Sequence, residues 1–149
     1  MATSAFDIHF QLRSAADSNG ETLFTFAFQS AKGVRGFQKT INQWLKCLLT
    51  QRGSDITSKG YGTAFPDLFT GNTFSVSDVE ERVVLAVDDA TQQILAFQRG
   101  QSSTDLPAEE RLSSASVVSV AQTAPSAYTV YVVLKNSLNQ SVKYALPTS

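Results

Sequence analysis

The spacing of apolar residues in the first part of the chain predicts two strands. Residues 5–13 alternate strictly between apolar and polar side chains, and residues 22–28 place three phenylalanines on one face. The apolar positions of these runs are Phe6, Ile8, Phe10, Leu12, Phe24, Phe26 and Phe28. The sequence Asp-Ser-Asn-Gly at 17–20 lies between the runs and is typical of a turn. Together they predict a β-hairpin within residues 1–32.

The apolar spacing then changes to that of an α-helix within residues 36–98. A first helix is predicted over residues 37–50. Its apolar face is formed by Phe37, Ile41, Trp44, Leu45, Leu48 and Leu49. A capping box at residues 77–80, with Ser77 as the cap and Glu80 as its partner, indicates a second helix that ends near Gln98. The apolar face of this helix is formed by Val79, Val83, Val87, Ala90, Ile94 and Phe97. The intervening residues 51–76 are expected to form a loop.

Alternation returns in the last third of the chain, after a polar loop at residues 99–110. Pro125-Ser126 separates the first two apolar runs, and residues 136–139 form the turn of a hairpin before the third run. The three runs occupy residues 112–122, 127–135 and 140–147. We therefore expect an antiparallel three-stranded sheet within residues 111–147. The order of elements predicts a single α+β domain over residues 1–149.

Charge and cysteine content narrow the class of protein. The net charge is −1 and the basic residues are scattered, so we expect neither a nucleic acid nor an anionic membrane as a partner. Charged residues make up 17% of the chain, against about 25% in an average globular protein, which indicates a surface partly covered by other proteins. Cys47 is the only cysteine and is expected in the core. The first ten residues lack the features of a signal peptide, so we expect a soluble protein made in a reducing cytoplasm.

The side chains that usually carry enzyme chemistry are sparse. His9 is the only histidine and lies on the polar side of a predicted strand, so no base accompanies a nucleophile. No set of residues has the spacing of a zinc or calcium site. The carboxylates at 80–81, 88–89 and 109–110 are neighbours, and neighbours on a helix point about 100° apart. A glycosidase pair of Glu80 and Asp55 remains conceivable, but nothing in the sequence brings these two together.

The stretch LLTQRGSDITSKGYGTAFPDLF at 48–69 places Gly53, Gly60 and Gly62 among charged and hydroxyl residues. It lacks the order of a phosphate-binding loop, it follows a helix instead of a strand, and no helix begins directly after it. We therefore expect no catalytic, cofactor-binding or metal-binding residue. The stretch is interpreted as a shaped connector in which Gly53 ends the helix, Gly62 lets the backbone turn, and Phe65, Leu68 and Phe69 dock on the core.

Taken together, this stretch and the second helix resemble the baseplate wedge family of contractile phage tails and type VI secretion systems, whose phage member is the tail sheath initiator. The resemblance covers residues 37–95. The matching positions are Leu48-Leu49-Thr50, Arg52-Gly53-Ser54, Tyr61-Gly62, Asp67-Leu68-Phe69 and Asp78-Val79-Glu80-Glu81-Arg82. One departure is that the family commonly carries Glu-Pro-Arg in its second helical region, where this chain has Thr91-Gln92-Gln93.

The resemblance implies a structural virion protein of the tail baseplate, present in several copies, that contacts sheath, tube and wedge proteins and performs no catalysis. It would start the first sheath ring by strand addition, in which an exposed sheet edge pairs with a partner strand. Candidate partner-binding residues in the loop are Arg52, Asp55, Lys59 and Tyr61. Those in the strands are Tyr128, Val130, Val132, Leu134, Val142, Tyr144 and Leu146. The run at 128–134 has apolar side chains on both faces, which fits a covered strand of the assembly or an ordinary central strand.

Two other functions stay open at this point. The family has often been labelled "lysozyme", so a peptidoglycan-cleaving enzyme is an alternative, with Glu80 and Asp55 as the acids to test. A general tail-completion or tube-associated protein of similar α+β build is another.

Overall fold

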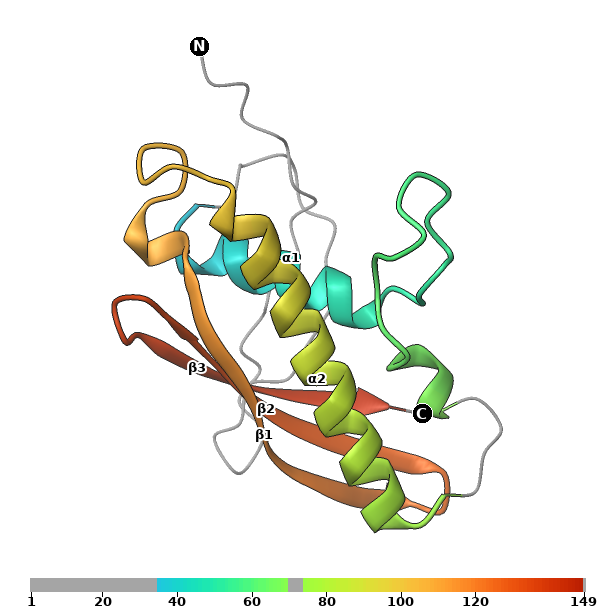
Figure 1. Ribbon diagram of the computed structural model, residues 1–149. Helices are drawn as coiled ribbons and strands as arrows, with labels where there is room; N and C mark the ends of the chain where they lie inside the picture. The colour runs from blue at the N-terminus through green and yellow to red at the C-terminus, as the bar shows by residue number, and fades with distance from the viewer. Residues whose placement is uncertain (1–34, 70–73, 149) are drawn as a thin grey trace, which may run out of the picture.

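The computed structural model describes residues 35–69 and 74–148 (Figure 1). Its elements are α1 (Phe37–Leu49), η1 (Pro66–Phe69), α2 (Val76–Arg99), η2 (Ala108–Glu110), β1 (Leu112–Ala124), β2 (Ala127–Asn136) and β3 (Ser141–Thr148). Two main helices followed by a three-stranded antiparallel sheet confirm the predicted α+β class. The hairpin predicted within residues 1–32 lies outside the described residues.

The sheet is a meander in the order β1-β2-β3, so β2 is its central strand. The turn at Pro125-Ser126 connects β1 to β2, and the register places Val132 of β2 between Val117 of β1 and Tyr144 of β3. The pairing of β1 with β2 is interrupted three times, whereas β2 and β3 pair in register along their length. Such bulges bend the strand and increase its twist.

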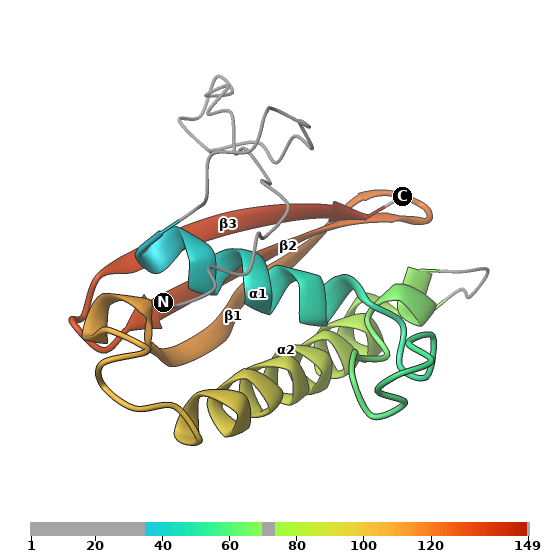
Figure 2. The same cartoon turned by 90° about the horizontal axis from the view of Figure 1, so that it is seen from above.

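Both helices lie on the same side of the sheet, which gives a fold of two layers (Figure 2). Alternate residues of β2 point toward the helices and are buried there. Trp44 of α1 lies at the centre of this core, and its Nε1–H donates to Thr91 Oγ1 of α2 at 3.0 Å. Because the Thr91 hydroxyl in turn donates to Val87 O at 2.6 Å, the buried indole N–H and hydroxyl both have partners.

The start of α2 differs from the prediction. Ser75 is the N-cap, two residues before the predicted Ser77, and its Oγ accepts a hydrogen bond from Asp78 N at 3.2 Å. The backbone of Ser75 is extended, as an N-cap requires, with φ −66° and ψ 156°. The spacing from Ser75 to Asp78 is the same as that from Ser77 to Glu80, so the sequence offers two overlapping caps and the chain uses the earlier one.

The end of each helix also departs from its predicted apolar face. Phe97 is exposed, and Gln98 takes the buried position beside it. The reason is that the Gln98 amide donates to Glu110 O at 3.1 Å and accepts from Leu112 N at 2.9 Å, where β1 begins. Leu49, the last residue of α1, is exposed as well.

Glu110 connects the beginning of α1 to the beginning of β1. Its Oε1 accepts from Gly36 N at 3.0 Å, and its Oε2 pairs with Lys39 Nζ at 2.8 Å. Thr40 Oγ1 donates to the Glu110 carbonyl as well. Since Gly36 provides no side-chain cap for α1, a carboxylate from a distant part of the sequence occupies the positive end of this helix.

Candidate interaction surface

The connector after α1 begins with a loop whose two ends are hydrogen-bonded to each other. Thr63 N donates to Thr50 O at 2.9 Å, and Arg52 N donates to Thr63 O at 3.1 Å. The hydroxyl of Thr63 donates to Leu48 O at 2.7 Å, so the base of the loop is fastened to the end of α1. Residues 51–62, called the 51–62 loop below, project from this base (Figure 1).

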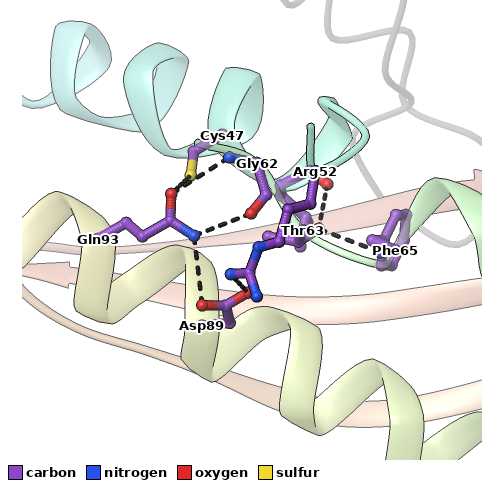
Figure 3. A network of polar contacts seen from close by, with 8 residues as sticks. Cys47, Arg52, Gly62, Thr63, Phe65, Asp89 and Gln93 are labelled. Carbon is purple, nitrogen blue, oxygen red and sulfur yellow. Dashed lines mark hydrogen bonds and ion pairs between the residues drawn. The ribbon is translucent and has the colours of Figure 1, made fainter. Parts of the chain in front are cut away.

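Gln93 of α2 holds the second end of the 51–62 loop (Figure 3). Its Oε1 accepts from Gly62 N at 3.2 Å, and its Nε2 donates to Gly62 O at 2.9 Å. The same amide accepts from Cys47 Sγ at 3.4 Å and donates to Asp89 Oδ1 at 3.2 Å. Burial raises the pKa of the Cys47 thiol, which keeps it protonated as a donor at neutral pH. One side chain thus joins α1, the loop and α2.

Two glycines of the loop have positive φ, at +85° for Gly53 and +97° for Gly62. Gly53 was expected to end α1, but Thr50 is the C-cap and Gly53 lies in the turn that follows. Phe65 and Leu68 are buried and Phe69 packs against the core, as the connector interpretation expects. The connector is therefore anchored by apolar contacts after the 51–62 loop.

The tip of the 51–62 loop is a hydrogen-bonded turn. Asp55 Oδ1 accepts from Thr57 Oγ1 at 2.6 Å, from Thr57 N at 2.8 Å and from Ser58 N at 3.3 Å. The Thr57 hydroxyl, followed by the Thr57 amide, lowers the pKa of Asp55. This turn displays Ile56, which is 93% exposed and is the most exposed large apolar side chain among the described residues.

The four loop residues that the sequence nominated for partner contacts are placed differently from one another. Arg52 forms a surface ion pair with Asp89 of α2, and Lys59 is exposed. Asp55 is engaged within its own turn, and Tyr61 packs against the core. Sequence reasoning passed over Ile56, although a single isoleucine in a polar spacer is a visible signal. Arg52, Ile56 and Lys59 are therefore among the exposed residues of the loop.

Replacing Gln93 with alanine is expected to release the 51–62 loop from α2. The change leaves both backbone groups of Gly62 without the amide partner, so the free energy of unfolding should fall by about 1–3 kcal/mol. Gln92→Ala is the matched control because Gln92 is the exposed neighbour on the same helix. Urea unfolding of both variants measures the effect, and equal stability of the two would contradict the role of Gln93.

The structure corrects the assignment of four β2 residues to partner binding. Tyr128, Val130, Val132 and Leu134 are buried against the protein's own helices. Both edges of β2 are hydrogen-bonded, to β1 on one side and to β3 on the other. The ordinary central strand is thus the arrangement that the chain adopts, and a strand with two neighbours cannot receive a third.

The residues nominated on β3 belong to an outer strand. Tyr144 and Leu146 point toward the helices and are buried, whereas Val142 is partly buried. Among the described residues, no segment pairs with the outer edge of β3 or with that of β1. Backbone pairing at these two edges is therefore the contact that the sheet can offer.

Tyr144 gives the sheet a measurable dependence on pH. Burial raises its pKa from the ordinary value of 10.0 to about 12, with a hydrogen bond to Gln38 acting in the opposite direction. The folded state holds this proton more tightly than the unfolded state, so the contribution to stability is complete below about pH 10 and is lost as the pH rises toward 12. In urea unfolding at about pH 9 and about pH 11, Tyr144→Phe should lose less stability between the two conditions than the wild type. Equal losses would contradict this.

The described residues contain no group of three or more His, Cys, Asp or Glu side chains that could hold a metal ion. No helix in this part of the chain combines the length and the apolar character needed to cross a membrane. Asp55, one of the two acids considered for a glycosidase, is engaged in the loop turn. The exposed features of the described residues are the 51–62 loop and the outer edges of β1 and β3.

Comparison with known proteins adds no family to these observations. No family model matches the chain, and no curated protein matches it.

Proposed function

We propose that this protein is a non-catalytic component of a contractile-tail baseplate, which acts as a sheath initiator and joins its partners by strand addition. The observation that carries the proposal is the C-terminal meander, whose two outer strands have no pairing partner among the described residues. Such an edge presents unpaired N–H and C=O groups that a strand of another chain can satisfy. Sheath, tube and wedge proteins are the proposed partners, in an assembly of several copies inside the virion tail.

The 51–62 loop supports the same proposal. Hydrogen bonds of Gln93 and Thr63 hold the base of the loop, and those of Asp55 hold its tip. The loop therefore presents Ile56 to solvent in a defined conformation. A loop ordered before binding loses little conformational entropy when a partner covers it. The exposed isoleucine on this ordered loop is an apolar contact for a protein partner, which supports a role in assembly.

The position that departs from the family's Glu-Pro-Arg bears on the wedge contact. Within Thr91-Gln92-Gln93, Thr91 and Gln93 are used inside the fold, and Gln92 alone faces solvent. The order Glu-x-Arg occurs at Glu80-Glu81-Arg82 within α2 and at Glu109-Glu110-Arg111 directly before β1. Neither segment carries the central proline, so the wedge contact of this chain is expected to differ from that of the family.

Reconstitution tests the proposed function. Purified sheath and tube proteins from the same virus are mixed with and without this protein, and the products are examined by electron microscopy. Sheath rings stacked from one end of the tube should form faster and in greater number when the protein is present. Identical products in both mixtures would contradict the proposal.

A further inference from the structure

The two outer strands of the sheet differ in the residues that protect an edge against pairing. β3 contains Lys143 and Pro147, and these residue types commonly prevent the addition of another strand. β1 contains no charged residue and no proline among its 13 residues. Only the bulges of β1 hinder the addition of another strand at this edge. Between the bulges, residues 114–117 and 119–122 pair regularly with β2. β1 is therefore the less protected of the two edges.

A band of partly exposed apolar side chains follows this edge. Val117 and Val120 of β1 are partly buried against the core, and Val84 of α2 is 46% exposed. Figure 2 shows β1 as the strand that lies nearest to α2. The two elements run in opposite directions: the end of α2 lies at the start of β1, where Leu112 N donates to the Gln98 side chain. The other end of α2 lies near the start of β2, where Tyr128 Oη donates to Phe74 O.

The residue spacing along α2 and β1 places Val84 and Val117 at about the same position along the edge of the sheet. Leu95 of α2 and Leu112 of β1 line the same hollow. Val84 precedes Leu95 by three helical turns, about 16 Å, and so lies on the same side of the helix. Val117 follows Leu112 by about 13 Å of strand, because the bulge after Leu112 sets five residue steps of β1 against four of β2. Val84 and Val117 therefore lie at about the same height along the edge of β1.

Two arginines line the hollow at the start of β1. Its volume is about 180 Å³, and Arg99 and Arg111 contribute to its lining. The guanidinium of Arg111 is oriented by two backbone carbonyls, with Nε donating to Leu106 O at 3.2 Å and Nη2 donating to Gln101 O at 3.0 Å. Within residues 35–69 and 74–148, neither arginine forms an ion pair with a carboxylate. Among the described residues, no carboxylate therefore neutralises the two arginines of the hollow.

We propose that the outer edge of β1 receives an extended segment of a partner protein that is apolar where it covers Val84 and Val117 and carries a carboxylate that enters the hollow beside Arg99 and Arg111. The inference rests on strand addition as the proposed function and adds the edge and the chemistry of the partner strand. Backbone pairing over residues 114–117 supplies the attachment, and the carboxylate fixes the register and direction of the added strand.

Peptide binding to the full-length protein tests this inference. The probe is an amidated peptide of alternating valine and threonine with two glutamates at one end, and hydrogen–deuterium exchange is the readout. The glutamate peptide should slow exchange in residues 113–120, and a peptide with lysines in place of the glutamates should bind more weakly. A third peptide without acidic side chains but with a free C-terminus shows whether a terminal carboxylate serves as well as a side chain.

Two substitutions with matched controls separate the parts of the inference. Val118→Lys adds to β1 the charge that this edge lacks and should abolish the protection by the glutamate peptide. Leu138→Lys is its control, because Leu138 in the turn after β2 is 54% exposed, as against 53% for Val118. Arg99→Gln should weaken binding of the glutamate peptide by about twofold to fivefold, whereas Lys46→Gln, at an exposed position on α1, should leave it unchanged.

Each other outcome overturns the inference in a distinguishable way. Protection of residues 141–148 would assign the added strand to β3 and leave strand addition as such intact. Equal binding of the glutamate and lysine peptides would remove the carboxylate site. Absence of protection at both edges would overturn the inference as a whole, and the sheath reconstitution would then decide separately whether the proposed function survives.

Discussion

Gly62→Ala is expected to lower the free energy of unfolding by about 3 kcal/mol and to detach the 51–62 loop from α2. A Cβ at this position would lie 2.4 Å from Thr50 O, which is a backbone atom that cannot turn aside. The φ of +97° is also unfavourable for any residue with a side chain. Relief of the clash requires the Thr63–Thr50 bond or the Gln93 bonds to Gly62 to break.

Gly53→Ala is the control that separates backbone strain from the clash. Gly53 has a similar φ of +85°, but a Cβ there would meet nothing within 4 Å. We expect Gly53→Ala to cost about 1 kcal/mol, which is the strain alone. Urea unfolding of both variants measures the difference, and hydrogen exchange at the Gly62 and Thr63 amides reports on the loop base. Equal costs for the two variants would contradict the tight contact at Gly62.

Trp44→Ala should have the other large effect, a loss of roughly 3–5 kcal/mol in the free energy of unfolding. The indole is wholly buried between α1, α2 and the sheet, and its removal leaves a cavity and takes the N–H from Thr91 Oγ1. Phe97→Ala is the matched control, since Phe97 is an exposed aromatic residue on α2. Its loss should stay below about 1 kcal/mol. A urea melt with similar losses for both variants would place Trp44 outside the core.

The local elements of the described part could be predicted from the sequence because they depend on neighbours along the chain. The 3.6-residue spacing from Phe37 to Leu48 and the alternation from Tyr128 to Leu134 each report one buried face. The choice between Ser75 and Ser77 as the cap of α2 could not be predicted, since both positions have an acidic residue at the required spacing. The burial of Gln98 in place of Phe97 depends on where β1 begins.

The contacts that hold the 51–62 loop and the start of α1 join residues far apart in the sequence. Gln93 reaches Gly62, and Glu110 reaches Gly36, and no pattern within either segment marks those partners. The assignment of β2 as the central strand likewise follows from the topology of the meander, because apolar side chains on both faces fit a central strand as well as one covered by a partner. The exposed Ile56 and the uncharged sequence of β1 were visible in the sequence, but their significance required the turn at Asp55 and the strand order.

An electron cryomicroscopy reconstruction of the tail base would show how this protein contacts its neighbours. We predict that a strand of a neighbouring protein lies against an outer strand of this chain and extends the three-stranded sheet. The further inference places that strand at β1, with a carboxylate beside Arg99 and Arg111. A baseplate in which this protein meets its neighbours through side chains alone, with both outer strands left unpaired, would contradict the account.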